Sequence, residues 1–186
     1  MAGFNVNTFR SSLQFDGARA SMFEVYITLP PVLGLTPLSS DIRFKVRATS
    51  LPGDSINSIS VPYFGREIKV AGTRNFPDWS FQVINDENFE IRNNLELWMS
   101  QINSHVGNIR SGDAPNSISY TTDGFVYQYN KEGKIIKTYN IVGAFPVDVS
   151  PIDLDWASGD QIEEFSVTFA YQYWTSVVPT PVTDLV

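Results

Sequence analysis

The stretch that decides the fold is residues 42–84, which read IRFKVRATSLPGDSINSISVPYFGREIKVAGTRNFPDWSFQVI. Apolar residues alternate with polar ones near both of its ends, and a period of two is the pattern of a strand that buries one face. Between these ends lie the Pro52-Gly53 turn and a shorter strand pattern at 67–71. The stretch therefore predicts strands joined by tight turns, and nothing in it is typical of a catalytic motif.

The same alternation continues on both sides of this stretch. It predicts further strands at 23–29, 125–129 and 165–173, and shorter ones at 135–142 and 145–149. Gly133 separates two β-rich runs, so residues 128–141 predict a hairpin. Such a series of strands favours antiparallel sheets packed face to face, or a small barrel.

One helix is predicted, at about 86–102, where apolar residues recur at helical spacing as Ile91, Leu95, Trp98 and Ile102. Asn85 or Asp86 can cap it, and Glu87 and Glu90 place negative charge in its first turn. Residues 30–40 and 103–116 are expected to be loops, and 175–186 to lack regular structure. The predicted fold is mainly β, with two packed antiparallel sheets as a sandwich or partial barrel and one flanking α-helix.

Composition narrows the class of protein. The 186 residues suit a single domain, 1–186, with enough apolar residues for a sizeable core. A net charge of -7 opposes tight binding to nucleic-acid phosphates, and the absence of cysteine excludes disulfide scaffolds and thiolate metal sites. The sequence shows neither a signal-peptide pattern nor an apolar run that spans a membrane, so folding in a cytoplasm is expected.

Catalytic motifs are hard to find. His105 is the single histidine, and no Gly-x-Ser-x-Gly motif accompanies it. Acidic residues gather near the C-terminus at Asp153, Asp155, Asp160, Glu163 and Glu164. Alternation places the first two on one strand face, as a solvated or interface-facing edge, while a hydrolase that uses Asp153 and Glu163 is the alternative. We expect that this protein is not an enzyme and that it has no catalytic site, metal site or cofactor.

Two strand faces suggest contacts of other kinds. Arg43, Lys45 and Arg47 form a basic face, whose charges repel unless they pair within the fold, for example with Glu24, or meet a neighbouring subunit or nucleic acid. The strand predicted at 165–173 is aromatic on one face and carries small, mostly polar, uncharged residues on the other. A face of that second kind suits the wall of a water-filled channel.

Several ordered segments resemble the tail tube protein family of contractile-tailed, T-even-like bacteriophages. They are FKVRATSLPG at 44–53, VP at 61–62, REIKVAG at 66–72, TRNFPDW at 73–79, NDE at 85–87, LDW at 154–156, IEEFSVTF at 162–169 and YW at 173–174. The similarity spans about 42–174, which implies a family-like core at about 20–174 and an extended C-terminal tail at 175–186. It also implies paired antiparallel sheets with a flanking helix.

The resemblance implies a structural virion protein without an active site. Copies would form hexameric rings that stack into a hollow tube around the tape-measure protein and later conduct DNA. Sheath and baseplate would be further partners, and assembly would take place in the host cytoplasm. Residues 50–65 are the expected ring-to-ring loop. The expected assembly interface comprises Arg43, Lys45, Arg47, Arg66, Lys69, Arg74 and Asp78.

Other assignments remain open at this stage. The same motifs fit the tube of a contractile injection system or a type VI-like secretion system, or a tube-like baseplate or terminator subunit. The loop at 30–40 is longer than in the family pattern, and the tail beyond Trp174 also extends past it. Outside the family, a β-sandwich binding module, such as a carbohydrate binder, is the remaining hypothesis.

Overall fold

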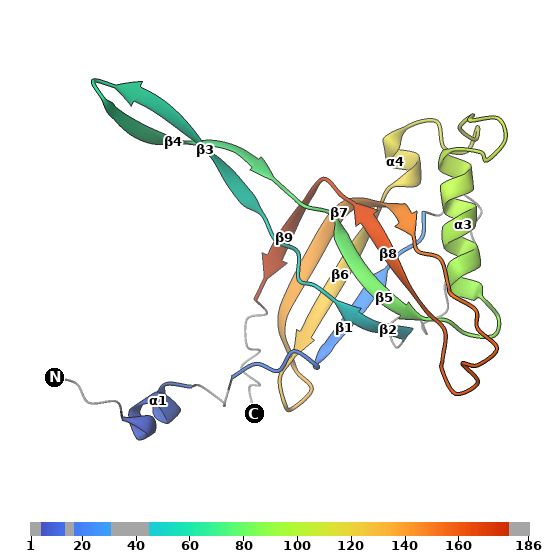
Figure 1. Cartoon of the computed structure of the whole chain (residues 1–186), viewed down its shortest axis with the longest axis horizontal. Coiled ribbons are helices and arrows are strands. Elements are labelled where there is room, and N and C mark those ends of the chain that lie inside the picture. The colour runs from blue at the N-terminus through green and yellow to red at the C-terminus, as the bar shows by residue number, and fades with distance from the viewer. Residues whose placement is uncertain (1–4, 14–16, 31–44, 179–186) are drawn as a thin grey trace, which may run out of the picture.

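The computed structural model describes residues 5–13, 17–30 and 45–178, and strands dominate it (Figure 1). In chain order the elements are α1 (Val6–Ser12), β1 (Phe23–Ile27), β2 (Val46–Thr49), β3 (Ser55–Tyr63), β4 (Arg66–Asn75), β5 (Trp79–Ile84), α3 (Glu90–Ile102), α4 (Ser117–Tyr120), β6 (Thr122–Tyr129), β7 (Ile135–Val149), β8 (Glu164–Ala170) and β9 (Tyr173–Val177).

Seven strands form one antiparallel sheet in the order β1-β6-β7-β8-β5-β2, with β9 added beside β7. The long strand β7 divides it, because β7 pairs with β6 and β9 as far as Ala144 and with β8 from Phe145 onward. The first half therefore contains β1, β6 and β9, and the second half contains β2, β5 and β8. The prediction of a mainly β fold with two antiparallel sheets is confirmed, with β7 shared between the sheets.

The sequence suggested two separate strands within β7, and this was wrong. Gly143 looks like a strand end, but its backbone has a φ of +67°, and the strand continues through it. A Cβ atom at Gly143 would lie 2.9 Å from Cγ of Gln172, so glycine is required at this bend. The hairpin between β6 and β7 is confirmed, with Gly133 at a φ of +78° in its turn.

The core lies between the two halves. Its fully or nearly buried apolar residues are Val25, Ile27, Val126, Tyr139, Ile141 and Ala144 in the first half and β7, Val46, Trp79, Phe81, Val83, Phe165, Val167 and Phe169 in the second half, together with Ile91, Leu95, Trp98 and Ala114. A Cβ atom on Gly124 of β6 would lie 3.2 Å from the Trp79 ring of β5, so the halves pack closely here. The strand periodicity predicted most of these inward positions correctly.

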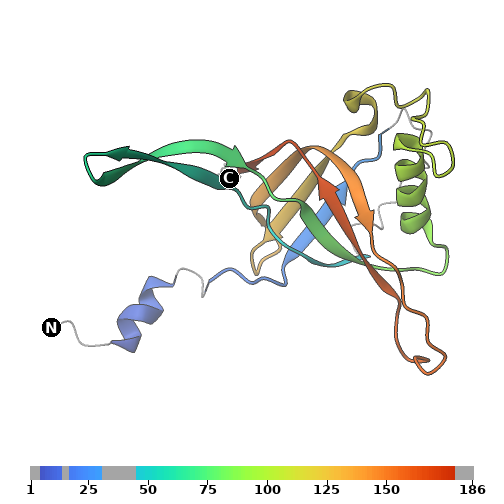
Figure 2. The same cartoon turned by 45° about the horizontal axis from the view of Figure 1, so that its top comes forward.

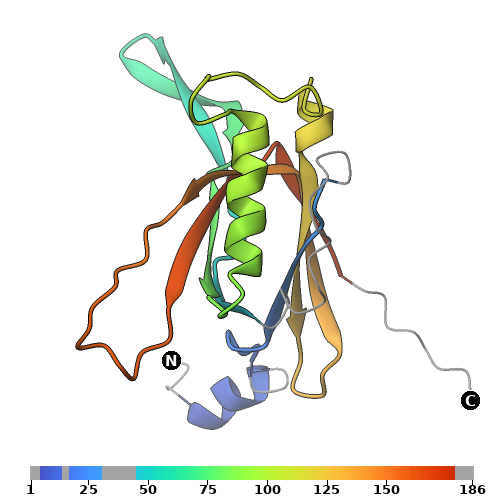
Figure 3. The same cartoon turned by 90° about the vertical axis from the view of Figure 1, so that its right-hand side faces the viewer.

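Helix α3 covers the open side between the two halves (Figure 3). Trp98 is fully buried, its ring meets Phe169 of β8 edge-on at 5.8 Å, and its Nε1–H donates to the Tyr120 carbonyl at 2.8 Å. The helix begins at Glu90, so the predicted start near 86 was wrong. Phe89 precedes it in a left-handed conformation without a side-chain cap, and Asp86 instead accepts a hydrogen bond from Lys45.

Three further predictions need correction. The strand expected over 165–173 is two strands, because the chain bends after Ala170 and β9 then pairs with β7. Residues 175–177 consequently belong to β9, whereas 179–186 lie outside the described residues. Residues 50–65 are not simply a loop, since most of them form β3. The sequence also missed the short helices α1 and α4. The expected loop at 30–40 falls almost wholly on residues that are not described.

Candidate subunit interface

Strands β3 and β4 form a separate two-stranded ribbon that projects from the body of the protein (Figures 1 and 2). Paired residues share a face of such a ribbon, and the pairs Ile59–Val70 and Val61–Ile68 lie on one face. We call this the apolar ribbon face; its members are Ile59, Val61, Tyr63, Ile68 and Val70, each 45–62% exposed. An isolated two-stranded hairpin is only marginally stable in water. We therefore expect another protein surface to bind this exposed apolar face.

The ribbon tip is a tight turn at Phe64 and Gly65, which both have positive φ, +45° and +79°. Two such residues match the right-handed twist of a hairpin, and glycine is favoured at the second position. Phe64 is 91% exposed, and its ring meets that of Tyr63 edge-on at 4.6 Å. The tip therefore presents two aromatic rings away from the body.

Four residues of the predicted assembly interface lie on or beside the ribbon. Arg66 is opposite Tyr63 and Lys69 is opposite Ser60, and neither forms an ion pair within the part of the chain that the structure describes. At the ribbon base, Arg74 pairs with Asp54 at 2.5 Å. Asp78 is exposed just after β4. The pKa of the nearby Tyr171 is raised, mainly by burial of its ring, and also by the charges of Asp78 and Asp54.

Two of the remaining predicted residues, Lys45 just before β2 and Arg47 within it, have partners within the fold. Lys45 Nζ lies 2.8 Å from a carboxylate oxygen of Asp86, and that hydrogen bond lowers the pKa of Asp86. Arg47 pairs with Glu164 at the start of β8. Glu24, named above as a partner for this face, accepts a hydrogen bond from Tyr129. Arg43 lies outside the described residues. A contact of these cations with another subunit stays a prediction.

A second exposed region is the acidic loop, residues 150–163 between β7 and β8. The strand predicted here was wrong, because local turns satisfy the backbone instead. The Asp155 carboxylate accepts from the Ala157 N–H at 3.0 Å, and the Asp155 carbonyl accepts from the Ser158 N–H at 3.0 Å. Large apolar side chains on this loop face solvent, with Leu154 80% exposed and Trp156 fully exposed.

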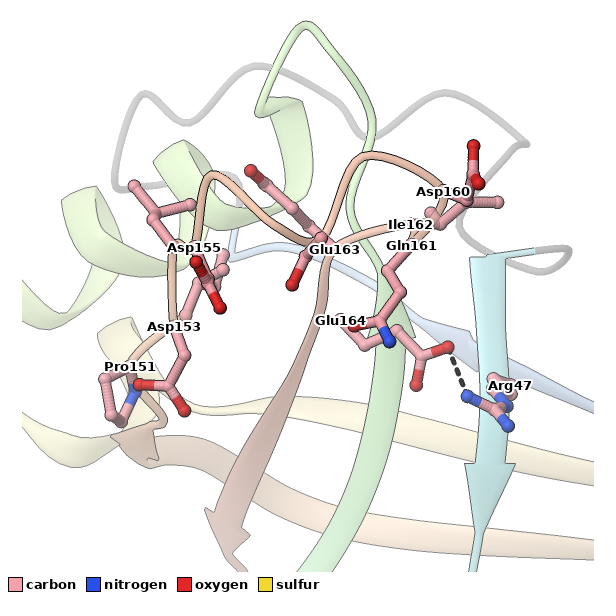
Figure 4. Close-up of a pocket in the computed structure, with 12 residues that line it drawn as sticks. Arg47, Pro151, Asp153, Asp155, Asp160, Gln161, Ile162, Glu163 and Glu164 are labelled. Carbon is pink, nitrogen blue, oxygen red and sulfur yellow. Dashed lines mark hydrogen bonds and ion pairs between the residues drawn. The ribbon is translucent and has the colours of Figure 1, made fainter.

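The acidic loop and Arg47 line a solvent-open pocket of about 770 Å³ (Figure 4). Asp160 lies at the opposite end of this pocket from Asp153 and Asp155. Glu163 accepts a hydrogen bond from the Asn85 side-chain amide at 2.8 Å. Over residues 5–13, 17–30 and 45–178, no group of three His, Asp or Glu side chains is placed to hold a metal ion. Nothing in this geometry favours the hydrolase alternative.

The outward faces of the two halves differ in chemistry. On the second half, Ser80 and Gln82 of β5 lie opposite Thr168 and Ser166 of β8, and the Ser80 and Thr168 hydroxyls are 3.2 Å apart. On the first half the outward face is aromatic, with the Phe125 and Tyr127 rings stacked at 6.2 Å. The polar, uncharged face predicted for the 165–173 strand thus extends over two strands.

Sequence reasoning missed the apolar ribbon face and the exposed tryptophan of the acidic loop. A signal for the ribbon was present, because Ile59, Val61 and Tyr63 alternate before Phe64-Gly65, as do Ile68 and Val70 after it. For Trp156 there was none, since Leu154 and Trp156 alternate with Asp153 and Asp155, which looks like the inward face of a strand. None of the helices in the described part of the chain could span a lipid bilayer.

Comparison with known proteins agrees with this architecture. A model of a family described as phage tail tube protein matches residues 18–177. Tail tube protein gp19 of Enterobacteria phage T4 is 35% identical over 160 residues, which cover 86% of this chain and 91% of the relative. In solved structures, a chain of the anti-feeding prophage baseplate has a TM-score of 0.62 at 13% identity, covering 87% of this chain and 96% of that one. A chain of the PVC sheath–tube complex, from an extracellular contractile injection system, has a TM-score of 0.58 at 14% identity, with coverages of 94% and 99%.

Proposed function

The chain belongs to the phage tail tube protein family, and we propose that its copies form hexameric rings that stack into the hollow inner tube of a contractile phage tail. The observation that carries this proposal is the similarity to the T4 tail tube protein, which extends over 86% of the chain. The likeness in fold extends to injection systems, but the similarity in sequence is to phage proteins, so a phage tube is favoured.

The sheet supplies a means of closing a ring. Among the described strands, β1 and β2 stand at the two ends of the sheet order and β9 pairs only with β7, so each of these three has one side without a strand partner. Unpaired strand edges join readily to a neighbouring chain, and a ring of heterologous contacts leaves no edge exposed. In the proposed ring, one edge of each copy meets the opposite edge of the next copy, and a continuous barrel results.

We propose that the polar outward face of β5 and β8 lines the lumen. Its side chains at Ser80, Gln82, Ser166 and Thr168 hydrate well and carry no charge. DNA could slide past such a wall without binding to it, because tight binding requires cations that neutralise phosphates. The net charge of -7 also opposes binding of the protein to DNA.

The proposed partners are the tape-measure protein inside the tube, the sheath around it and the baseplate below it. The chain acts as one domain over residues 1–186, is assembled in the host cytoplasm and ends in the virion tail. We propose no catalytic role for it, no cofactor and no membrane anchor.

Negative-stain electron microscopy of the concentrated, purified protein tests the assembly. We expect stacked rings or long hollow tubes. If the protein remains as small particles at every concentration, and also when tape-measure protein and baseplate are supplied as a template, the proposed function is wrong.

A cysteine-labelling experiment tests the lumen separately. The chain has no cysteine, so Gln82→Cys introduces a single thiol. In assembled tubes this thiol should react with a small maleimide but not with a maleimide on a large polymer, and dissociated subunits should react with both. Equal reaction of tubes with both reagents would place this face on the outside.

A further inference from the structure

Two exposed regions of the protein have complementary chemistry and lie at opposite ends of the molecule. The ribbon projects at one end of the long axis, and the acidic loop between β7 and β8 projects at the other (Figures 1 and 2). Each copy can therefore contact one neighbouring copy through its ribbon and another through its acidic loop. Such contacts are heterologous, and they propagate from copy to copy.

The ribbon combines apolar area with a net positive charge, because Arg66, Lys69 and Arg74 outnumber its single carboxylate, Glu67. Its apolar face and its tip, Tyr63 and Phe64, are solvent-exposed. Arg66 lies on that same face at the tip end, and Lys69 lies on the opposite face. Neither cation pairs with a carboxylate among the described residues.

The acidic loop has the reverse charge with a similar apolar content. Residues 150–163 contain four carboxylates and no lysine or arginine. Leu154, Trp156 and Ile162 are each at least 71% exposed. A fully exposed tryptophan near several acids suits a partner surface that carries both cations and apolar side chains. Its ring can form cation–π contacts with the cations and can pack against the apolar side chains.

We propose that the ribbon of one copy docks on the acidic loop of the next copy. The ribbon tip then lies among the carboxylates of the loop, which Arg66 reaches from the apolar face and Lys69 from the opposite face, and Tyr63 and Phe64 pack against Trp156 and Leu154. This contact covers the tip end of an apolar face that a two-stranded ribbon cannot bury by itself. The inference rests on the proposed tube function and adds the identity of the surface that receives the ribbon.

Charge reversal tests the pairing. The loop variant carries Asp153→Lys and Asp160→Lys, and the ribbon variant carries Arg66→Glu and Lys69→Glu. Each alone should raise the protein concentration needed for tube formation by more than about tenfold, since like charges then meet. An equimolar mixture of the two variants should assemble again, and so should the quadruple variant. The control matched to the loop variant, Asp113→Lys with Glu132→Lys, changes two exposed acids elsewhere by the same net charge and should assemble normally.

The outcomes of this experiment distinguish failure of the docking inference from failure of the proposed tube function. If the wild-type protein forms tubes and both charge variants form them equally well, the docking inference is wrong and the tube function stands. The inference is also wrong if both variants remain folded by near-ultraviolet circular dichroism but neither the mixture nor the quadruple variant recovers. A wild-type protein that never assembles, even with its template, overturns the tube function and the docking inference together.

Cross-linking gives a direct readout of proximity. Glu67→Cys near the ribbon tip and Ala157→Cys in the acidic loop introduce the only thiols of the chain. In assembled protein, a short bis-maleimide should link the double variant into ladders of many copies and each single variant into dimers at most. Dimers alone from the double variant would contradict a head-to-tail contact.

Discussion

Two phenylalanine residues allow stability and assembly to be separated experimentally. Phe169 is fully buried, and its ring centre lies 5.5 Å from that of Phe81, 5.8 Å from that of Trp98 and 6.1 Å from that of Trp79. Phe64 at the ribbon tip is 91% exposed. The same substitution to alanine therefore removes the same atoms from opposite environments.

The expected magnitudes differ strongly. Phe169→Ala should lower the free energy of unfolding by about 3–5 kcal/mol, because burial is lost and a cavity remains between sheet and helix. That is a large fraction of the roughly 5–15 kcal/mol typical of a domain. Phe64→Ala should change it by less than about 0.5 kcal/mol. For assembly the order reverses, because Phe64→Ala removes a ring from the proposed contact while the subunit stays folded.

Urea denaturation followed by tryptophan fluorescence measures the change in the free energy of unfolding. The measurement is made at protein concentrations where sedimentation shows no assembly. With a urea dependence of about 2 kcal/mol per molar, Phe169→Ala should lower the midpoint by about 2 M. A shift below about 0.5 M would refute the packing argument. If Phe64→Ala lowers the midpoint as much as Phe169→Ala does, the ribbon tip packs on its own subunit and the docking argument fails.

Three smaller effects follow from the body of the protein. Gly143→Ala should lower the free energy of unfolding by at least about 1 kcal/mol, because alanine is strained at positive φ and its Cβ has no room; an unchanged thermal midpoint would contradict the bend. Asp86→Asn should cost less than about 1 kcal/mol at neutral pH. Because Lys45 lowers the pKa of Asp86 in the folded protein, this difference should vanish as the pH falls through that lowered pKa, and a difference that persists in acid would refute the pairing. Trp98→Phe should cost about 1–3 kcal/mol in thermal unfolding, since it leaves the Tyr120 carbonyl unsatisfied, and a neutral result would show that the hydrogen bond is dispensable.

Strands with one buried face could be predicted from the sequence. In β5 and β8, the residues that alternate inward, such as Phe81 and Phe169, are buried in the structure, because the core imposes the period of two. The ribbon was harder to predict, since its residues alternate like those of a half-buried strand although both of its faces are exposed. Val61 and Ile68 look like core residues in the sequence, and only the fold shows that they are not.

Two other errors have a common physical origin. In the acidic loop, Leu154 and Trp156 alternate with acids, but the Asp155 carboxylate accepts a hydrogen bond from the Ala157 N–H, and the segment forms no strand. At the basic face, the sequence identified Lys45 and Arg47 as charges in need of partners but not which partners they take. Pairing of a side chain with a residue far along the chain depends on tertiary geometry, and local patterns do not contain it.

The shared strand β7 has a mechanical consequence. Because it runs through both halves as fifteen consecutive residues, a force applied to one half reaches the other along covalent bonds. Pulling the halves apart along β7 loads its hydrogen bonds to β6, β8 and β9 in shear, so many must break together rather than one at a time. A subunit built in this way resists being pulled apart into its two halves along β7.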